Sequence, residues 1–320
     1  MTKSVKGKGA YSLAFVRLFS FLVKIGNNFN KLGLRFGLRR MSRNPGIISG
    51  WEAIDKFTEL IPEMKYYNQS DALYQIRLRT LANGYYDLGK WLERVSSNPE
   101  DLRELRENLT FVGSHFFRGE VWPTLRQQLE SMLSGNDKER INVWCAGCSN
   151  GKEVYSVLML LSDLVPLDKV SLLATDYNRE MLRQCEAGVY SLRTIDEIPL
   201  KYWPFTEKYN EGRGTKKDFS HLFQFRFVSR LRDLIQTRYV NLLTGDYPQG
   251  FDLVFCRNVI KFFENDSKRK VQERLAASVN PGGIIVVSDE IEREGFPDPE
   301  SLGLTQVDNS CVYIKSAVLL

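Results

Sequence analysis

From about residue 138 to the C-terminus, strand-like apolar runs alternate with helix-like amphipathic runs. The strand-like runs are INVWCA (141–146), VSLLATD (170–176), RYVNLL (238–243), FDLVFCRN (251–258) and IIVVSDE (284–290). The helix-like runs between them are 152–165, 178–188 and 265–279. In the second of these, Asn178 is placed to cap the helix and Gly188 to end it, and NPGG (280–283) follows the third as a turn. This alternation predicts an α/β fold with a doubly wound, mostly parallel sheet covered on both faces.

One segment, at about 191–238, interrupts this rhythm. It is rich in Lys, Arg, Tyr and Phe, and LFQFRFVSRLRDL (222–234) alternates like half-buried antiparallel strands. We therefore predict a small inserted β-subdomain within a domain that spans 111–320.

Residues 47–110 show helical periodicity and no strand signal. One helix is predicted from a stripe of apolar residues that ends at Asn83-Gly84, and a second follows it. The stripe and the second helix consist of Leu73, Ile76, Leu78 and Leu81, and of Leu88, Trp91 and Leu92. We expect a small N-terminal helical domain.

Residues 1–46 form a basic leader with ten Lys or Arg and no acidic residue, so the rest of the chain carries a net charge of −5. Helical spacing in the leader fits a basic amphipathic helix that makes a weak contact with a membrane surface. A disordered arm, or a start codon at Met41, fits the same residues. The mildly acidic body argues against a nucleic-acid partner.

The cysteines indicate a reducing compartment. The five are an odd set without framework spacing, and no apolar run approaches the roughly 20 residues of a membrane span. Cys145 and Cys148 form a C-x-x-C, but no second pair accompanies them and the chain has only two histidines, His115 and His221. A four-ligand zinc site therefore has little to draw on. We expect a cytoplasmic protein without a metal site.

The turn between the first strand and its helix is the main candidate for a ligand site, because ligands of open α/β sheets bind beyond the carboxyl ends of the strands. Gly147 and Gly151 are spaced G-x-x-x-G around Ser149, which is neither the dinucleotide fingerprint nor a P-loop. Glu153, in the first helical turn, would repel a pyrophosphate and suit a cationic ligand. An acid there can also simply complement the helix dipole.

Asp176 ends the second strand, 25 residues after Gly151. An acid at this point commonly accepts hydrogen bonds from ribose hydroxyls. An acid that holds ribose, beside a turn hostile to phosphate, points to a nucleoside without phosphates. S-adenosyl-L-methionine (SAM) fits this description.

In these features the chain resembles the chemotaxis-receptor glutamate methyltransferases (the CheR type), from about residue 60 to 312. The matching segments, in order, are HFFRGEVW, AGCSNGKEVYS, LLATDYN, AGVYS, VNLL, FDLVFCRNVIKFF, NPGG and SDE. YQIRLRTLANGYYDLGKWL resembles the family's N-terminal helical domain. The resemblance implies a SAM-methyltransferase sheet with a small β-subdomain inserted before the third strand.

The resemblance also implies roles for individual residues. It assigns Glu153 to the amino-acid portion of the cofactor and Asp176 to its ribose, with Arg118 facing the transferred methyl group and the acceptor. Further cofactor-binding positions are Ser114, Asn241, Leu242 and Asn258, together with Gly147 and Ser149 of the turn.

Three departures from the family pattern affect the acceptor side. The family's N-x-T before FFR is Val112-Gly113-Ser114, the first acid of its usual GEE is Lys152, and its active-site tyrosine is Phe262, next to Lys261. Cofactor binding is therefore expected to be better preserved than the acceptor side.

The expected activity is transfer of a methyl group from SAM to glutamate side chains of a chemoreceptor-like protein. A carboxylate is ionised at neutral pH and needs no general base. It needs in-line placement, and Arg118 can hold one carboxylate oxygen. The expected partner of a monomeric enzyme is an acidic receptor helix, which Arg77 and Arg79 can meet if they are not simply a solvated face. The alternatives are a non-catalytic SAM-binding signalling module and a methyltransferase with a small-molecule or other non-receptor acceptor.

Overall fold

The structure is a computed structural model, and it describes residues 50–66, 76, 80, 85, 87–108, 114–134, 139–209, 224–287, 296 and 298–317. Several predictions fall outside this part of the chain. They concern the leader 1–46, the stripe residues Leu73, Leu78 and Leu81, the stop at Asn83-Gly84, and Arg77, Arg79 and His221.

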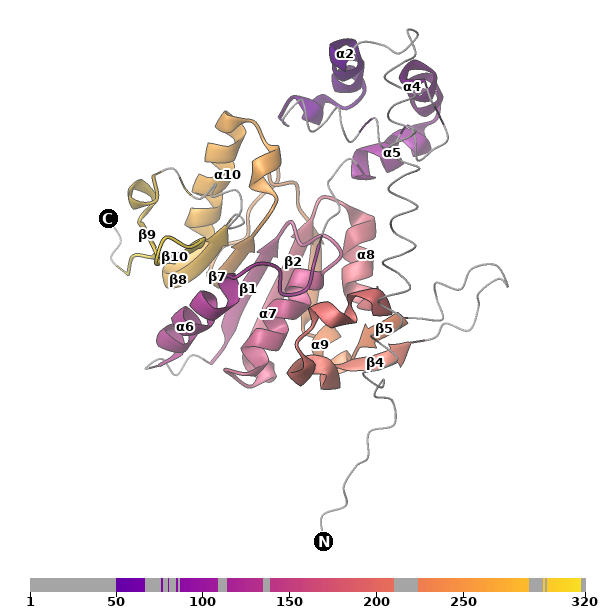
Figure 1. Ribbon diagram of the computed structural model, residues 1–320. Coiled ribbons are helices and arrows are strands. Elements are labelled where there is room, and N and C mark those ends of the chain that lie inside the picture. Colours follow the sequence, from indigo (N-terminus) through magenta and orange to yellow (C-terminus); the bar gives the residue numbers. More distant parts are fainter. Residues whose placement is uncertain are drawn as a thin grey trace.

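A seven-stranded sheet forms the centre of the protein (Figure 1). Its order is β6-β2-β1-β7-β8-β10-β9, and the pairs among β6, β2, β1, β7 and β8 are parallel, whereas β10 is antiparallel to both neighbours. The strands are β1 (Ile141–Ala146), β2 (Val170–Asp176), β6 (Ile235–Tyr239), β7 (Phe251–Cys256), β8 (Val279–Val287), β9 (Leu304–Gln306) and β10 (Val312–Lys315). The predicted α/β fold class is confirmed.

Helices cover both faces of this sheet, and the alternation of side chains along β1 separates the two cores. Val143 and Cys145 pack with the side chains of α6, α7 and α8, whereas Trp144 and Ala146 pack with those of α10. The bounds are α6 (Val121–Leu133), α7 (Lys152–Ser162), α8 (Arg179–Ala187) and α10 (Asn265–Ser278). Three-residue helical turns are η2 (Leu167–Lys169), η6 (Ile260–Phe262) and η7 (Glu300–Leu302).

The predicted ends of α8 are confirmed. The Asn178 side chain accepts hydrogen bonds from the backbone N–H groups of Glu180 and Met181, and Gly188 ends the helix in the left-handed conformation at φ 61°. Both residues act as their types predict, since Asn supplies a capping oxygen and Gly tolerates a positive φ.

A second, three-stranded antiparallel sheet, β3-β5-β4, lies within the segment that interrupts the main alternation. Its strands β3 (Val189–Ser191), β4 (Thr206–Tyr209) and β5 (Gln224–Phe227) accompany η3 (Leu192–Glu197), η4 (Leu200–Phe205) and α9 (Ser229–Arg232). We refer to the described residues 189–209 and 224–232 as the inserted segment. The next strand, β6, already belongs to the large sheet.

Three local predictions were wrong. The strand expected at 238–243 begins earlier, at Ile235, and ends at Tyr239, because the chain then turns with the Gly245 N–H donating to the Asn241 carbonyl at 2.7 Å. NPGG is not a separate turn but lies within β8, beside a register shift against β7. The second half of 222–234 includes the short helix α9.

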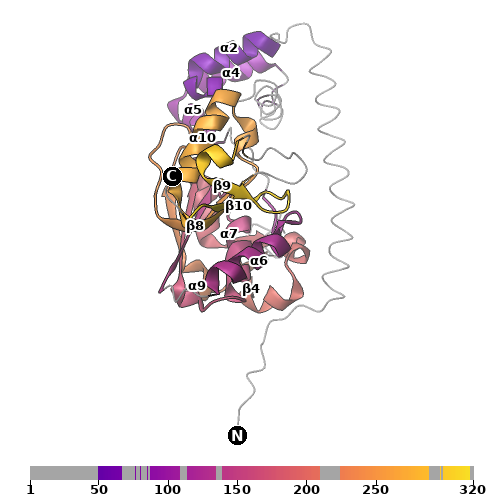
Figure 2. The ribbon, with the colours of Figure 1, turned by 90° about the vertical axis from the view of Figure 1, so that its left-hand side faces the viewer.

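The elements described upstream of 114 are all helices and have their own apolar cluster, formed around Phe57 and Trp91, with rings 5.9 Å apart. The helices are α2 (Gly50–Leu60), η1 (Pro62–Tyr66), α4 (Leu88–Ser96) and α5 (Pro99–Asn108). They lie beyond the end of α10 (Figures 1 and 2), where the Glu264 N–H donates to the Tyr66 carbonyl at 2.8 Å. No helix in the described ranges is long and apolar enough to cross a membrane.

Candidate functional site

A pocket opens at the carboxyl ends of β1, β2 and β7, where the strand order reverses on either side of β1. Open α/β sheets bind ligands at such a switch point. All nine residues predicted from the sequence line this one pocket: Ser114, Arg118, Gly147, Ser149, Glu153, Asp176, Asn241, Leu242 and Asn258.

The turn after β1 depends on two glycines. Gly147 has φ 69°, and a Cβ there would lie 2.5 Å from a methyl carbon of Val259. Gly151, at φ 87°, precedes α7, and its Cβ would lie 2.5 Å from the Cys185 sulfur. Both the backbone conformation and the close approach therefore require glycine.

Left-handed backbone also occurs at non-glycine residues around the pocket. Ser149 has φ 50° and Asn258 has φ 58°, while Phe117, next to Arg118, has φ 45°. Such conformations cost of order 1 kcal/mol or more each and cluster at ligand sites. Here these conformations set the backbone direction at two predicted site residues, Ser149 and Asn258, and at Phe117, which directly precedes Arg118.

Asp176 is buried at the end of β2 and accepts backbone hydrogen bonds from both sides. Its Oδ2 accepts from the Ser149 N–H at 2.7 Å, and its Oδ1 accepts from the Asn178 N–H at 2.9 Å. Burial raises the pKa of this carboxyl, and the backbone N–H groups oppose that rise. Since each carboxylate oxygen accepts more than one hydrogen bond, the carboxylate both braces the glycine turn and retains capacity for a ligand.

Glu153 has a partner that the sequence analysis missed. The Arg257 Nη1 lies 2.9 Å from the Glu153 Oε2 and also donates to the Arg118 carbonyl at 3.1 Å. The Arg257 side chain is fully buried. The pocket wall therefore carries an ion pair between a buried guanidinium and a partly exposed carboxylate, rather than a lone carboxylate. The signal was present, because Arg257 lies within the FDLVFCRN run beside Asn258.

The segment after β6 forms another wall. The Val240 N–H donates to the Asp176 carbonyl at 3.1 Å, and the Asn241 side chain accepts from the Leu243 N–H at 2.9 Å. The Leu242 carbonyl accepts from the Tyr247 hydroxyl at 2.7 Å, and the Arg274 guanidinium lies 3.9 Å from the Tyr247 ring centre. These contacts fix Asn241 and Leu242 at the pocket.

Ser114 and Arg118 reach the pocket from a loop that precedes α6. The Phe117 ring stacks on Tyr202 at 5.4 Å and packs edge-on against Trp122 at 4.9 Å. The Trp122 Nε1 donates to the Arg118 carbonyl at 3.1 Å. We name residues 114–118 the FFR loop.

The positions that depart from the family pattern lie in different surroundings. Phe262 lines the pocket, and the Lys261 Nζ lies 5.2 Å from its ring centre. The Lys152 side chain is instead buried, with its Nζ 3.6 Å from the Glu197 Oε2. Among these positions, Ser114 and Phe262 therefore change the lining of the pocket and Lys152 does not, while Val112 and Gly113 lie outside the described residues.

Cys145 and Cys148 are both free and buried. Burial raises the pKa of the Cys145 thiol, which disfavours the reactive thiolate. Cys148 borders the pocket among small side chains.

The pocket fits SAM in its donor set. A carboxylate at the end of β2 suits ribose hydroxyls, and the Glu153–Arg257 pair offers both charges to an amino-acid group.

Comparison with known proteins gives a consistent result. Residues 113–297 match the family described as "CheR methyltransferase, SAM binding domain". The chain is 26% identical over 257 residues to a "Chemotaxis protein methyltransferase" of Listeria monocytogenes, covering 79% of this chain and 92% of that protein. It is 31% identical over 206 residues to "Chemotaxis protein methyltransferase 1" of Vibrio cholerae, covering 62% and 69%.

Proposed function

The chain belongs to the CheR methyltransferase family, and on that premise we propose that it methylates glutamate side chains of a chemoreceptor-like protein. Membership makes it a SAM-dependent methyltransferase. The carboxylate acceptor and the receptor are the proposed part. The observation that carries the proposal is the meeting of nine predicted residues, Arg118 among them, in one pocket.

The cofactor would be held by the walls of the pocket. In the proposed arrangement, Asp176 accepts from the ribose hydroxyls, Asn241 and Leu242 flank the adenine, and the Glu153–Arg257 pair meets the amino-acid group. Ser149 and Asn258 contribute at the glycine turn and beside it. When bound, SAM supplies an electrophilic methyl group on a sulfonium sulfur.

Methyl transfer to a carboxylate requires no general base at the acceptor end of the pocket. A glutamate carboxylate is ionised at neutral pH, so no proton has to be removed before its oxygen takes up the methyl group. Arg118 would donate to the second carboxylate oxygen and orient the first, while Ser114 lies beside it on the same loop. Phe262 would exclude water from this end without supplying a hydroxyl.

The proposed partner is an acidic receptor helix inside the cell, met by a monomeric enzyme. The relatives from Listeria monocytogenes and Vibrio cholerae are named chemotaxis protein methyltransferases, which supports a receptor of that kind. The acidic partner complements an arginine at the pocket.

Calorimetric titration with SAM tests the cofactor half of the proposal. We expect binding to the wild-type chain, and Asp176→Ala to weaken it by about thirtyfold, or ~2 kcal/mol. Asp168→Ala, in η2, is the matched control and should bind as wild type. Absence of binding by the wild-type chain would overturn the assignment of the pocket.

Transfer of a tritiated methyl group to purified chemoreceptor signalling domains tests the acceptor. A glutamate ester releases its label as methanol in mild base, and receptor variants with Gln in place of the labelled Glu should accept none. Cofactor binding without labelling of any receptor would favour the non-catalytic module. Label that resists base would show a different acceptor group.

A further inference from the structure

The FFR loop is fixed to the inserted segment by aromatic packing. The Phe116 ring is 2% exposed and lies 5.1 Å from Tyr190, 6.1 Å from Phe225 and 5.7 Å from Phe227. These three partners belong to β3 and β5. Phe116 is therefore part of the core of the inserted segment, although Ser114, His115 and Arg118 of the same loop line the cofactor pocket.

A second set of contacts fixes the backbone on the far side of Phe116. The Phe117 N–H donates to the Ser156 hydroxyl at 3.0 Å, and that hydroxyl donates to the Lys152 carbonyl at 2.9 Å. Phe117 also holds a left-handed φ of 45°, directly before Arg118. Because a strained φ persists only where surrounding contacts hold it, these contacts set the direction in which Arg118 leaves the loop.

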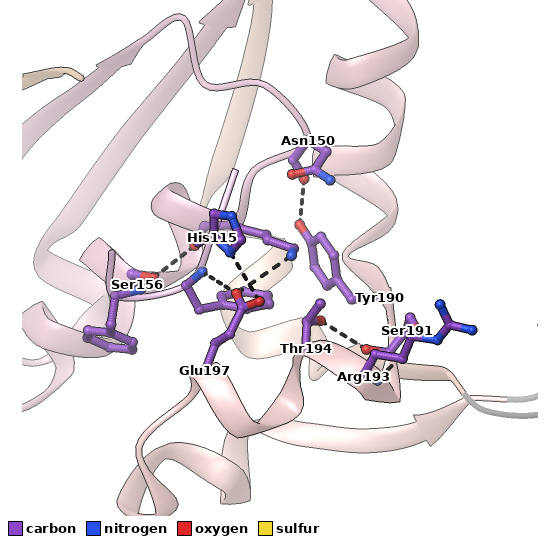
Figure 3. A network of polar contacts seen from close by, with 11 residues as sticks. His115, Asn150, Ser156, Tyr190, Ser191, Arg193, Thr194 and Glu197 are labelled. Atoms are coloured by element: carbon purple, nitrogen blue, oxygen red, sulfur yellow. Dashed lines mark hydrogen bonds and ion pairs between the residues drawn. The ribbon is translucent and has the colours of Figure 1, made fainter. Parts of the chain in front are cut away.

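Glu197, the last residue of η3, joins both sets of contacts (Figure 3). Its Oε2 accepts a hydrogen bond from the Phe116 N–H at 2.8 Å, and its Oε1 lies 3.2 Å from the His115 Nδ1. One carboxylate of the inserted segment thus contacts two successive residues of the loop that carries Ser114 and Arg118.

Lys152 is the charge partner of this carboxylate. Its Nζ lies 3.6 Å from the Glu197 Oε2 and 5.4 Å from the Phe116 ring centre, and its side chain is only 10% exposed. Burial lowers the pKa of Lys152, and Glu197 opposes that effect. The family resemblance implies an acid at position 152, where this chain has a lysine. Because the Lys152 ammonium group is largely buried, it needs a carboxylate nearby.

A further contact links the inserted segment to the glycine turn. The Tyr190 hydroxyl donates to the Asn150 carbonyl at 2.6 Å (Figure 3). The inserted segment therefore touches two of the loops that carry predicted cofactor residues, the FFR loop through Glu197 and the glycine turn through Tyr190.

We propose that Glu197 is a positioning residue for the methyltransferase site, which acts through the Phe116 N–H and Lys152 to hold Ser114 and Arg118 at the pocket. The inference rests on the family activity and on the cofactor half of the proposed function. It does not depend on which acceptor is methylated. Lys152 and Glu197 form one unit, in which the carboxylate keeps a buried ammonium group paired and the loop in place.

Four variants separate this role from a purely structural one. Glu197→Ala removes every contact, and Glu197→Gln keeps an acceptor for the Phe116 N–H but leaves Lys152 without its charge partner. The double variant Lys152→Met/Glu197→Gln keeps the acceptor and removes the unpaired charge. Glu207→Gln is the matched control, because Glu207 pairs with Arg226 between β4 and β5 at 2.8 Å within the same segment.

The measurement is the affinity for S-adenosylhomocysteine by calorimetry, at a temperature well below the unfolding midpoint of every variant. We expect Glu197→Ala to bind about tenfold more weakly, because displacement of the loop moves Ser114 and the backbone that line the cofactor pocket, whereas the proposed contact of the Arg118 side chain is with the acceptor. Glu197→Gln should fall between Glu197→Ala and wild type, the double variant should return to within about threefold of wild type, and Glu207→Gln should match it.

Two results would overturn the proposal. They are wild-type affinity in Glu197→Ala, whether or not its unfolding midpoint is lowered, and a double variant that binds no better than Glu197→Gln. If Glu197→Ala does not fold, the comparison of Glu197→Gln with the double variant decides. A wild-type chain that does not bind S-adenosylhomocysteine would instead contradict the assignment of the cofactor pocket.

Discussion

Arg257 and Glu153 form an ion pair with Nη1 and Oε2 2.9 Å apart, and the arginine side chain has no solvent exposure. Arg257 follows β7, and Glu153 lies in the first turn of α7, the helix after β1. The pair therefore links the loop after β7 to the start of α7 at the pocket. A fully buried guanidinium that also donates to the Arg118 carbonyl has a structural role as well as an expected ligand role.

Removing the carboxylate of this pair should be the costlier change, because the guanidinium stays fully buried, whereas Glu153 is partly exposed in the pocket. We expect Glu153→Gln to lower the free energy of unfolding by about 3 kcal/mol, with a smaller loss for Arg257→Met. Urea denaturation measures both, and the double variant should lose less than the sum of the single losses. Strict additivity would show that the two side chains do not interact in solution.

Arg118→Ala should abolish methyl transfer with little change in SAM affinity, because its proposed donation is to the acceptor. A decrease in kcat of about a hundredfold or more is expected. Arg118→Lys should recover only part of this loss, since a lysine lacks the planar pair of donors. Arg193→Ala, an exposed arginine of η3, is the control. A large loss of cofactor affinity in Arg118→Ala would show that its main role is in binding SAM.

Gly147→Ala should destabilise the glycine turn in two separable ways. The left-handed φ costs about 1–2 kcal/mol for alanine, and the new Cβ would meet Val259 at 2.5 Å. Gly147→Ala/Val259→Ala removes the contact and retains the φ cost, so its unfolding midpoint should lie between those of Gly147→Ala and the Val259→Ala control. If the double variant is no more stable than Gly147→Ala, the close approach to Val259 is not what requires glycine.

Asp163 should make stability depend on acid pH. Partial burial alone would raise its pKa, but hydrogen bonds from Lys201, Tyr202 and Arg126 to its Oδ2 lower it below the ordinary 3.8. A carboxyl whose pKa is lower when folded stabilises the fold above its unfolded pKa, and that contribution disappears as pH falls through the folded value.

The comparison of wild type with Asp163→Asn isolates this effect. The difference in their free energies of unfolding should be largest above pH ~5 and should shrink as the pH falls below about 4. A difference that stays constant across this range would contradict the lowered pKa of Asp163.

The sequence predicted the parts of the fold that follow from local chemistry. The capping residue Asn178 and the terminating Gly188 mark the ends of α8 because each acts within its own turn of chain. Runs buried on both faces marked β1, β2 and β7. Four of the nine pocket residues, Gly147, Ser149, Glu153 and Asp176, follow from the same reasoning, because the carboxyl ends of parallel strands meet at one edge of the sheet. The other five were implied by the family resemblance: Ser114, Arg118, Asn241, Leu242 and Asn258.

What could not be predicted depends on partners distant in the sequence. The Arg257–Glu153 pair joins residues 104 positions apart, and the local pattern of apolar and polar residues gives no sign of such a contact. The apolar residues Val240 and Leu242 resemble a strand, but they are buried in a turn that packs against the α10 side of the sheet. NPGG is typical of a turn, yet pairing with β7 extends β8 through it.

The long sequence separations of the pocket contacts have a consequence for biosynthesis. The Phe116 N–H meets a carboxylate 81 residues later, and the Arg118 carbonyl meets a guanidinium 139 residues later. During translation, the FFR loop therefore leaves the ribosome long before its partners exist. Contacts of this span form late, since the intervening chain must first be ordered. A nascent chain should remain unable to retain the cofactor until β7 and Arg257 have emerged, so a truncated product would not sequester SAM.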